Sequence, residues 1–123
     1  MSGHWSAQAI GVAADLGIAD LLSKGPQTSG ELTIATGSNH QALYRLMRAL
    51  ASVGVFTELE PERFALTPIA EGLRADAPAS QRDRALHMCS DVQWRTWGQL
   101  GYSVRTGQPA FKQVHGMDAW EYR

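Results

Sequence analysis

The sequence has 123 residues, of which 44% are hydrophobic, and its 11 Lys and Arg are balanced by 12 Asp and Glu, for a formal net charge of −1. This length suits one domain with a modest core, and the charge balance disfavours a free-standing nucleic-acid binder, which usually carries a basic surplus. A single cysteine, Cys89, rules out an internal disulfide and favours a reducing, cytoplasmic setting. No apolar run approaches the length of a membrane span, and the first residues lack the pattern of a signal peptide.

The first predicted element is a helix from Trp5 to Leu22, which is rich in Ala, Ile, Leu and Val. Its apolar residues fall at helical spacing on two adjoining stripes, so more of its circumference is apolar than one small core can cover. We therefore expect this helix to lie centrally in the fold or to face another chain. Gly25 and Pro26 end the helix.

Two short helices are predicted next. Thr28 and Glu31 have the spacing of a capping box, and Gly37 suits the end of the helix that they begin. Ser38 and Gln41 repeat the spacing and predict the start of a second helix, which ends at the next glycine. One face of this second helix is apolar and consists of Leu43, Leu46, Met47, Leu50 and Val53.

The segment "VFTELEPERFALT" alternates around a polar tip, which predicts a β-hairpin. The apolar residues of its two arms are Val55, Phe56 and Leu59, followed by Phe64 and Leu66. Thr67 and Pro68 open another short helix. From Gln81 to about Val104 the apolar spacing predicts one longer helix, and Gly and Pro punctuate the tail that follows it.

This order of helices around a hairpin fits a winged helix flanked by extra helices. In a DNA-binding protein of this kind the second helix of the pair enters the major groove, and the wing touches the DNA backbone. Gln41, Arg45 and Arg48 suit base contacts, but the wing tip carries three glutamates. Residues 28–76 hold four arginines against six carboxylates, a net charge of −2 that a polyanion repels. Nucleic acid is therefore disfavoured as a partner, and a winged-helix transcription regulator remains the alternative.

Four stretches together carry a resemblance to a known family. They are "AADLGIADLL", "TSGELTIATGSNHQALYRLMRALASVGVF", "FALTPIAEGLR" and "WGQLGYSVRTGQPAFKQVHGMDAWEYR". The chain resembles the N-terminal region of the S-adenosylmethionine-dependent small-molecule O-methyltransferases, both the plant caffeate type and the bacterial antibiotic-pathway type. The resemblance runs from about Ala7 to Arg123, and the last stretch is the most specific part because transcription regulators do not carry it.

The resemblance implies a mainly α fold, in which residues 1–106 form a winged-helix-like dimerisation domain with a small β-hairpin wing and extra flanking helices. Residues 107–123 would form a linker toward an α/β methyl-donor domain that this sequence does not contain. The chain would form a homodimer through exchanged N-terminal helices, which explains the surplus apolar surface of the first helix. The residues that we assign to this interface are Ile10, Ala13, Leu16, Gly17 and Leu21.

The resemblance also implies that the chain supplies part of the wall of a pocket for a small aromatic or polyketide-like acceptor. Aromatic and methionine side chains suit such a wall. The residues that we assign to it are Trp5, Met88, Trp94, Trp97 and Phe111. The same side chains suit ordinary core and interface packing, and the sequence leaves both interpretations open. A stand-alone dimeric binder of a hydrophobic small molecule is a further alternative.

We expect no catalytic, cofactor-binding or metal-binding residue in this chain. The sequence lacks a Gly-rich turn after an apolar strand, which a methyl-donor site of the doubly wound type requires, so S-adenosylmethionine is expected only for a complete enzyme. The four histidines lack metal-ligand spacing, and His87 and Cys89 would point to different helix faces. Cys89 has no neighbouring base in the sequence that would activate it as a nucleophile.

Overall fold

The computed structural model describes residues 3–116, without the side chains of His4, Lys112, Gln113 and His115. The end of the expected linker, residues 117–123 with Trp120 and Tyr122, lies outside the described residues. Twelve elements are described. They are α1 (Gly3–Leu16), α2 (Ile18–Leu21), β1 (Gln27–Thr28), α3 (Ser29–Thr36), α4 (His40–Ser52), β2 (Phe56–Glu60), β3 (Arg63–Leu66), α5 (Pro68–Glu71), α6 (Arg82–Met88), α7 (Asp91–Trp97), α8 (Leu100–Thr106) and α9 (Ala110–His115).

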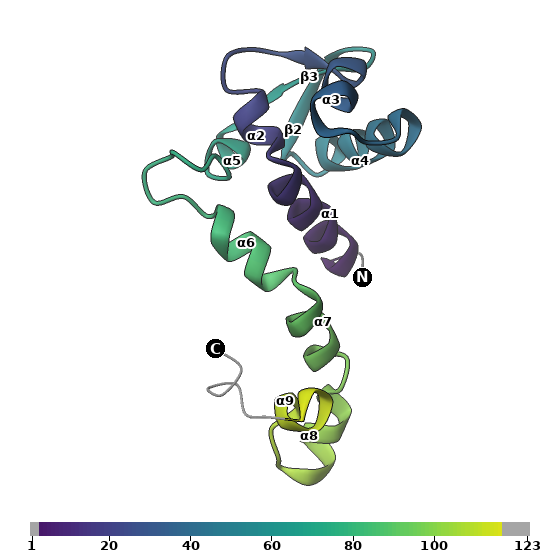
Figure 1. Ribbon diagram of the computed structural model, residues 1–123, viewed down its shortest axis with the longest axis vertical. Helices are drawn as coiled ribbons and strands as arrows, with labels where there is room; N and C mark the ends of the chain where they lie inside the picture. The colour runs from purple at the N-terminus through teal and green to yellow at the C-terminus, as the bar shows by residue number, and fades with distance from the viewer. Residues whose placement is uncertain (1–2, 117–123) are drawn as a thin grey trace.

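The molecule has two parts along its long axis (Figure 1). Helices α1 to α5 and the sheet form a winged-helix body, and α6 lies along α1. Helices α7, α8 and α9 extend away from this body; we call residues 91–115 the arm. The mainly helical winged-helix fold with a small β wing is therefore confirmed. Within the described part of the chain, no helix is long and apolar enough to cross a membrane.

The helix predicted from Trp5 to Leu22 is wrong as a single element, because it is broken at Gly17. Gly17 adopts the left-handed conformation, with φ of 71°, which glycine reaches without the steric cost that a Cβ brings. The break turns Ile18 and Leu22 into the core, where they are 0% and 2% exposed. A continuous helix would place these side chains on a different face.

The predicted capping box of α3 is confirmed. Thr28 accepts a hydrogen bond from the backbone N–H of Glu31, and the Glu31 side chain accepts one from the backbone N–H of Thr28. The start of α4 differs from the prediction, because Asn39 rather than Ser38 caps it by accepting from the backbone N–H of Ala42. The Ser38 hydroxyl is instead hydrogen-bonded to Thr36 Oγ1 at 2.7 Å.

The core lies between α2, α3, α4 and the sheet. Its largest fully buried side chains are Phe56, Phe64, Ile18, Leu32, Met47 and Leu50. Helix α4 contributes Leu43, Met47 and Leu50 as predicted, but Val53 is half exposed because it lies just after the last helical turn. The apolar face of α4 is therefore shorter by one residue than its spacing indicated.

The wing is a β-hairpin to which a third short strand is added. The strand order is β1-β3-β2, and all pairs are antiparallel. Phe56 pairs with Leu66 and Glu58 with Phe64, as expected for the hairpin, while Gln27 of β1 pairs with Phe64 from the other side. β1 was not predicted from the sequence, because it has only two residues and the second, Thr28, is also the cap of α3.

The helix predicted from Gln81 to Val104 is also broken. Ser90 caps the start of α7 by accepting from the backbone N–H of Gln93, and Gly98 ends that helix. No residue of α6, α7 or α8, all of which the structure describes, is buried. Helix α9 was not predicted; it begins at Ala110, which is buried.

Candidate functional site

The exposed face of α4 is in contact with the acidic wing. The Tyr44 hydroxyl donates to Glu58 Oε2 at 3.3 Å, and the backbone N–H of Glu62 donates to the same oxygen at 2.8 Å. The Arg48 guanidinium lies over the Tyr44 ring, 5.5 Å from its centroid. The pKa of the Tyr44 phenol is raised by two effects. The larger is burial of the phenol beside the wing, and the next is the negative charge of the Glu58 carboxylate. In a DNA-binding winged helix this face of the second helix contacts the major groove. Here it is hydrogen-bonded to the Glu58 carboxylate through Tyr44.

Ser29, His40 and Glu62 form a cluster whose residue types match those of a hydrolase triad. Ser29 Oγ lies 3.1 Å from His40 Nε2, and Glu62 Oε1 lies 3.4 Å from the same nitrogen. In a catalytic triad the serine and the acid contact opposite ring nitrogens, and here they share one. Ser29 is also completely buried, so no substrate reaches its hydroxyl.

The cluster instead holds the turn of the wing. Glu62 has a φ of 67°, which is rare for a residue with a Cβ. Its backbone oxygen accepts from the Ser29 N–H at 2.7 Å, and its side chain accepts from the Ser29 hydroxyl at 3.2 Å. These bonds compensate for the strained backbone and tie the wing to the start of α3.

Cys89 lies at the crossing of α1 and α6. Its thiol donates to the backbone oxygen of Ala7 at 2.7 Å, and burial raises its pKa, so it remains a neutral thiol rather than a nucleophilic thiolate at neutral pH. A Cβ on Gly11 would overlap the Cβ of Cys89, so the two helices approach as closely as they do because residue 11 is glycine. Among the residues that the structure describes, no group of three His, Cys, Asp or Glu side chains could hold a metal ion.

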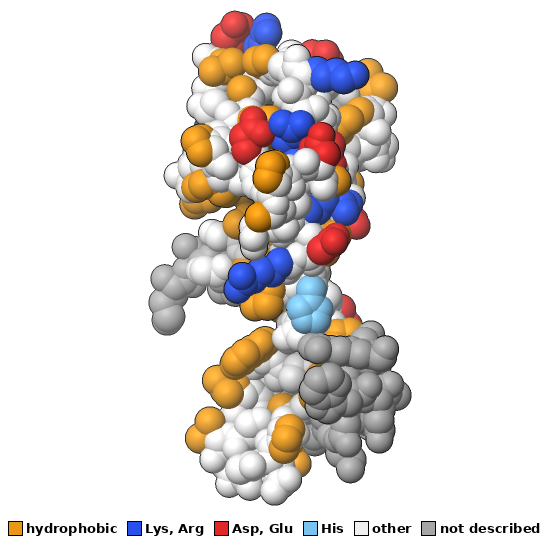
Figure 2. Space-filling view, turned by 90° about the vertical axis from the view of Figure 1, so that its left-hand side faces the viewer, with side chains coloured by type: hydrophobic (Ala, Val, Ile, Leu, Met, Phe, Trp, Pro, Cys, Tyr) orange, Lys and Arg blue, Asp and Glu red, His pale blue; other side chains and the backbone are white. Residues whose placement is uncertain are grey.

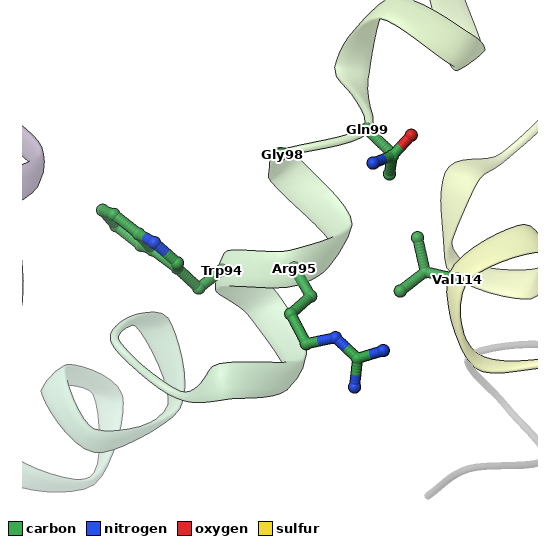
Figure 3. A pocket seen from close by; sticks show the side chains of 5 residues that line it. All are labelled: Trp94, Arg95, Gly98, Gln99 and Val114. Carbon is green, nitrogen blue, oxygen red and sulfur yellow. The ribbon is translucent and has the colours of Figure 1, made fainter.

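The arm contains a hollow with a volume of about 470 Å³. It is lined by Trp94, Arg95, Gly98, Gln99 and Val114. Figure 3 shows Arg95 and Gln99 extending from α7 and the turn after it toward Val114 on α9, while the indole of Trp94 extends away from α9. The hollow thus combines one cation and one amide with an aliphatic wall. Arg95 and Gln99 were not predicted from the sequence, because the position of α9 opposite them carries no local signal.

A second hollow of about 210 Å³ lies between α1 and α4. Trp5 and Ala9 line it from α1, and Ala49 and Leu50 line it from α4. Trp5 is 71% exposed, so most of its indole still faces solvent. Its lining is more apolar than that of the hollow in the arm, which suits contact with an apolar surface.

The predicted wall residues are therefore not gathered in one pocket within this chain. Trp94 lines the hollow in the arm and Trp5 lines the hollow beside α4. Met88 at the end of α6 and Trp97 on α7 are more than half exposed, and Phe111 on α9 is partly buried. Figure 2 shows that charged side chains gather over the winged-helix body, while hydrophobic side chains are prominent over the arm.

The predicted interface residues are mostly turned toward the core of their own chain. Ala13 is only 2% exposed, and Ile10, Leu16 and Leu21 pack partly against the core. The exposed large apolar residues of α1 are instead Trp5 and Val12. These two side chains expose apolar surface that a second chain can cover.

Comparison with known proteins assigns the family. A family model described as the O-methyltransferase dimerisation domain matches residues 1–76. The chain belongs to the O-methyltransferase dimerisation domain family. Arm residues 91–115 lie outside the matched region, so the family model covers the winged-helix body and the arm comes in addition.

Comparison with individual relatives extends the similarity from residues 1–76 to nearly the whole length of this chain. It is 41% identical over 122 residues to the phenazine O-methyltransferase PhzM of Lysobacter antibioticus, which covers 99% of this chain and 36% of that protein. The crystal structure of LaPhzM superposes with a TM-score of 0.93 at 40% identity over 98% of this chain and 36% of that chain. The structure of NcsB1 from neocarzinostatin biosynthesis, in complex with S-adenosylmethionine and 2-hydroxy-5-methyl naphthoic acid, superposes with a TM-score of 0.77 at 37% identity, covering 94% of this chain and 36% of that one.

The chain thus spans about a third of the length of the relatives that it matches. The residues described here do not fit S-adenosylmethionine themselves. Their sheet is a small antiparallel one, and no parallel strand is followed by a Gly-rich turn and a helix. The comparisons give no support to the DNA-binding alternative, in agreement with the acidic wing.

Proposed function

We propose that this chain is the dimerisation and acceptor-wall part of a small-molecule O-methyltransferase. The observation that carries the proposal is the superposition of nearly the whole chain, arm included, on LaPhzM with a TM-score of 0.93. The complete enzyme would bind S-adenosylmethionine outside this chain and transfer its methyl group to a small aromatic or polyketide-like acceptor. The part described here brings two subunits together and lines one side of the acceptor pocket.

Homodimer formation through α1 is the first element of this proposal. Trp5 and Val12 leave apolar surface exposed on a helix that otherwise packs into the core. Apolar surface of this kind, on an element that belongs to a dimerisation domain, is covered by the second subunit. Residues 1–106 would act as this dimerisation unit, and 107–123 would lead toward the methyl-donor domain.

The acceptor wall is the second element. The exposed Met88, Trp94 and Trp97 follow one another along α6 and α7 and provide flat or adaptable apolar surface. NcsB1, whose fold over this region is shared, was solved with a naphthoic acid bound. A planar acceptor that packs against the arm is the ligand that this surface suits.

The mass of the polypeptide in its native source tests the proposal first. A product about 150 to 250 residues longer than this chain corresponds to one added α/β domain, and methyl transfer from S-adenosylmethionine to planar phenols is then assayed with that product.

The double variant Met88→Ala/Trp94→Ala is expected to weaken binding of a planar phenol while the dimer remains. A native mass of 13.4 kDa, or a longer product without methyl transfer to any planar phenol, would refute the proposal.

A further inference from the structure

The hollow in the arm has side chains suited to a negatively charged ligand. Arg95 makes its ion pair with Asp91, one turn earlier on α7, at 3.7 Å, and both side chains are more than half exposed. Exposed pairs at this spacing are weak, so a ligand can draw the guanidinium away at little cost. In the described part of the chain, the Gln99 side-chain amide makes no hydrogen bond.

The shape of the hollow limits the ligand further. Arg95 and Gln99 lie on one side and Val114 on the other, as Figure 3 shows, and Gly98 adds no side chain to fill the space between them. A volume of about 470 Å³ lies within the range of small-molecule sites. The Arg95 guanidinium and the Gln99 amide both supply N–H donors of the kind that a carboxylate accepts from, and the Val114 methyl groups suit a flat apolar ring.

We propose that the hollow between α7 and α9 binds a planar aromatic carboxylate, whose carboxylate is held by the Arg95 guanidinium and the Gln99 amide. This inference rests on the proposed function and deepens it, because it assigns the acceptor substrate an acidic group. Arg95 is then a residue that selects the acceptor, and Asp91 competes with the ligand for its guanidinium.

The test uses the 123-residue chain labelled with ¹⁵N and two isosteric probes, 2-naphthoate and its neutral amide, 2-naphthamide. We expect 2-naphthoate to shift the signals of the Arg95 Nε–H and the Gln99 amide, and to bind about tenfold more tightly than 2-naphthamide, as charge-assisted hydrogen bonds do. In Arg95→Gln the preference for the acid disappears. In Arg105→Gln, the matched change on α8, the preference remains.

A second variant keeps the test informative if Arg95→Gln does not fold. Asp91→Asn removes the competing carboxylate and is expected to tighten binding of 2-naphthoate only about twofold, since an exposed pair of this kind is weak. Equal affinities for acid and amide, or no binding of 2-naphthoate at about 1 mM, where even a weak site is occupied, would overturn the inference. Acid-selective binding without methyl transfer by the native polypeptide would leave the site in place and remove only the proposed function.

Discussion

At the scale of single residues, a few side chains determine how the helices and the wing meet. Gly11 permits the close crossing of α1 and α6, and Tyr44 joins α4 to the wing through Glu58. Neither contact follows from residue spacing, because each joins segments that are distant in the sequence. Each can be changed by one substitution that leaves the surrounding structure in place.

Gly11→Ala is expected to lower the free energy of unfolding by about 1–3 kcal/mol, the usual cost of overpacking a tight contact. The added methyl group would overlap the Cβ of Cys89, which is fixed to the backbone at the end of α6 and cannot turn aside as a long side chain can. Urea unfolding followed by circular dichroism measures the change. Gly30→Ala is the control, because a Cβ on Gly30 meets only Thr28 Oγ1 at 3.7 Å. Equal stabilities for Gly11→Ala and the unchanged chain would contradict the close crossing.

Tyr44 predicts a dependence of stability on alkaline pH. Its pKa in the folded chain lies above the ordinary value of 10.0, so its contribution is complete below that value and is lost as the pH rises through the folded pKa. Tyr44→Phe removes the titration, and its stability is expected to fall less between about pH 9 and pH 11. Tyr102→Phe on α8 is the matched control and should lose stability as the unchanged chain does. The prediction is wrong if the two variants respond alike.

At the scale of elements, the structure depends on where helices stop. The caps with a local signature, Thr28 with Glu31 and the glycine at position 37, were predicted from the sequence because all their partners lie within four residues. The breaks at Gly17 and Ser90 were not predicted, because the apolar spacing continues across both. Burial of Ile18 and Leu22 decides the first break, and this is a tertiary effect. The capping hydroxyl of Ser90 decides the second.

Gly17→Ala tests the first break. An alanine pays about 1–2 kcal/mol to adopt the left-handed conformation that Gly17 has. The alternative, a helix that continues through position 17, would turn Ile18 out of the core, so the strain is the smaller loss. We expect the melting temperature to fall while the circular dichroism spectrum stays unchanged. A gain in helical signal with unchanged stability would show that the break is not required.

At the scale of the whole molecule, the arrangement of α1 predicts how subunits associate. Val12→Arg places a charge on the exposed apolar face of α1, where 46% of the Val12 surface is free in the single chain. Burying an unpaired charge in an interface is unfavourable, so the variant is expected to elute as a monomer. Ile34→Arg on α3, at an even more exposed position, is the control and should remain a dimer. Light scattering gives the masses, against twice the 13.4 kDa of the chain.

The family and the winged-helix body could be inferred from the sequence, but the site could be inferred only in part. The predicted Trp94 does line the hollow in the arm, because aromatic residues on an exposed helix carry their own signal. Arg95 and Gln99 could not be predicted as lining residues of this hollow, because the hollow forms only when α9 lies beside α7. The interface residues were taken from two adjoining apolar stripes of one predicted helix. In the structure Ala13 is buried, and Ile10, Leu16 and Leu21 pack partly against the core of their own chain.

The lack of buried residues in α7 and α8 has a consequence for how the chain opens. Amide protons in α4 and β3, which surround Met47 and Phe64, are released only when the whole domain unfolds. Amide protons of α7 and α8, residues 91–106, are protected mainly by their own helical turns, so they exchange through local fraying. The arm, in which we propose the ligand site, is therefore separated energetically from the part that determines the fold. Substitutions in the arm are expected to alter ligand binding while the melting temperature of the winged-helix body stays constant.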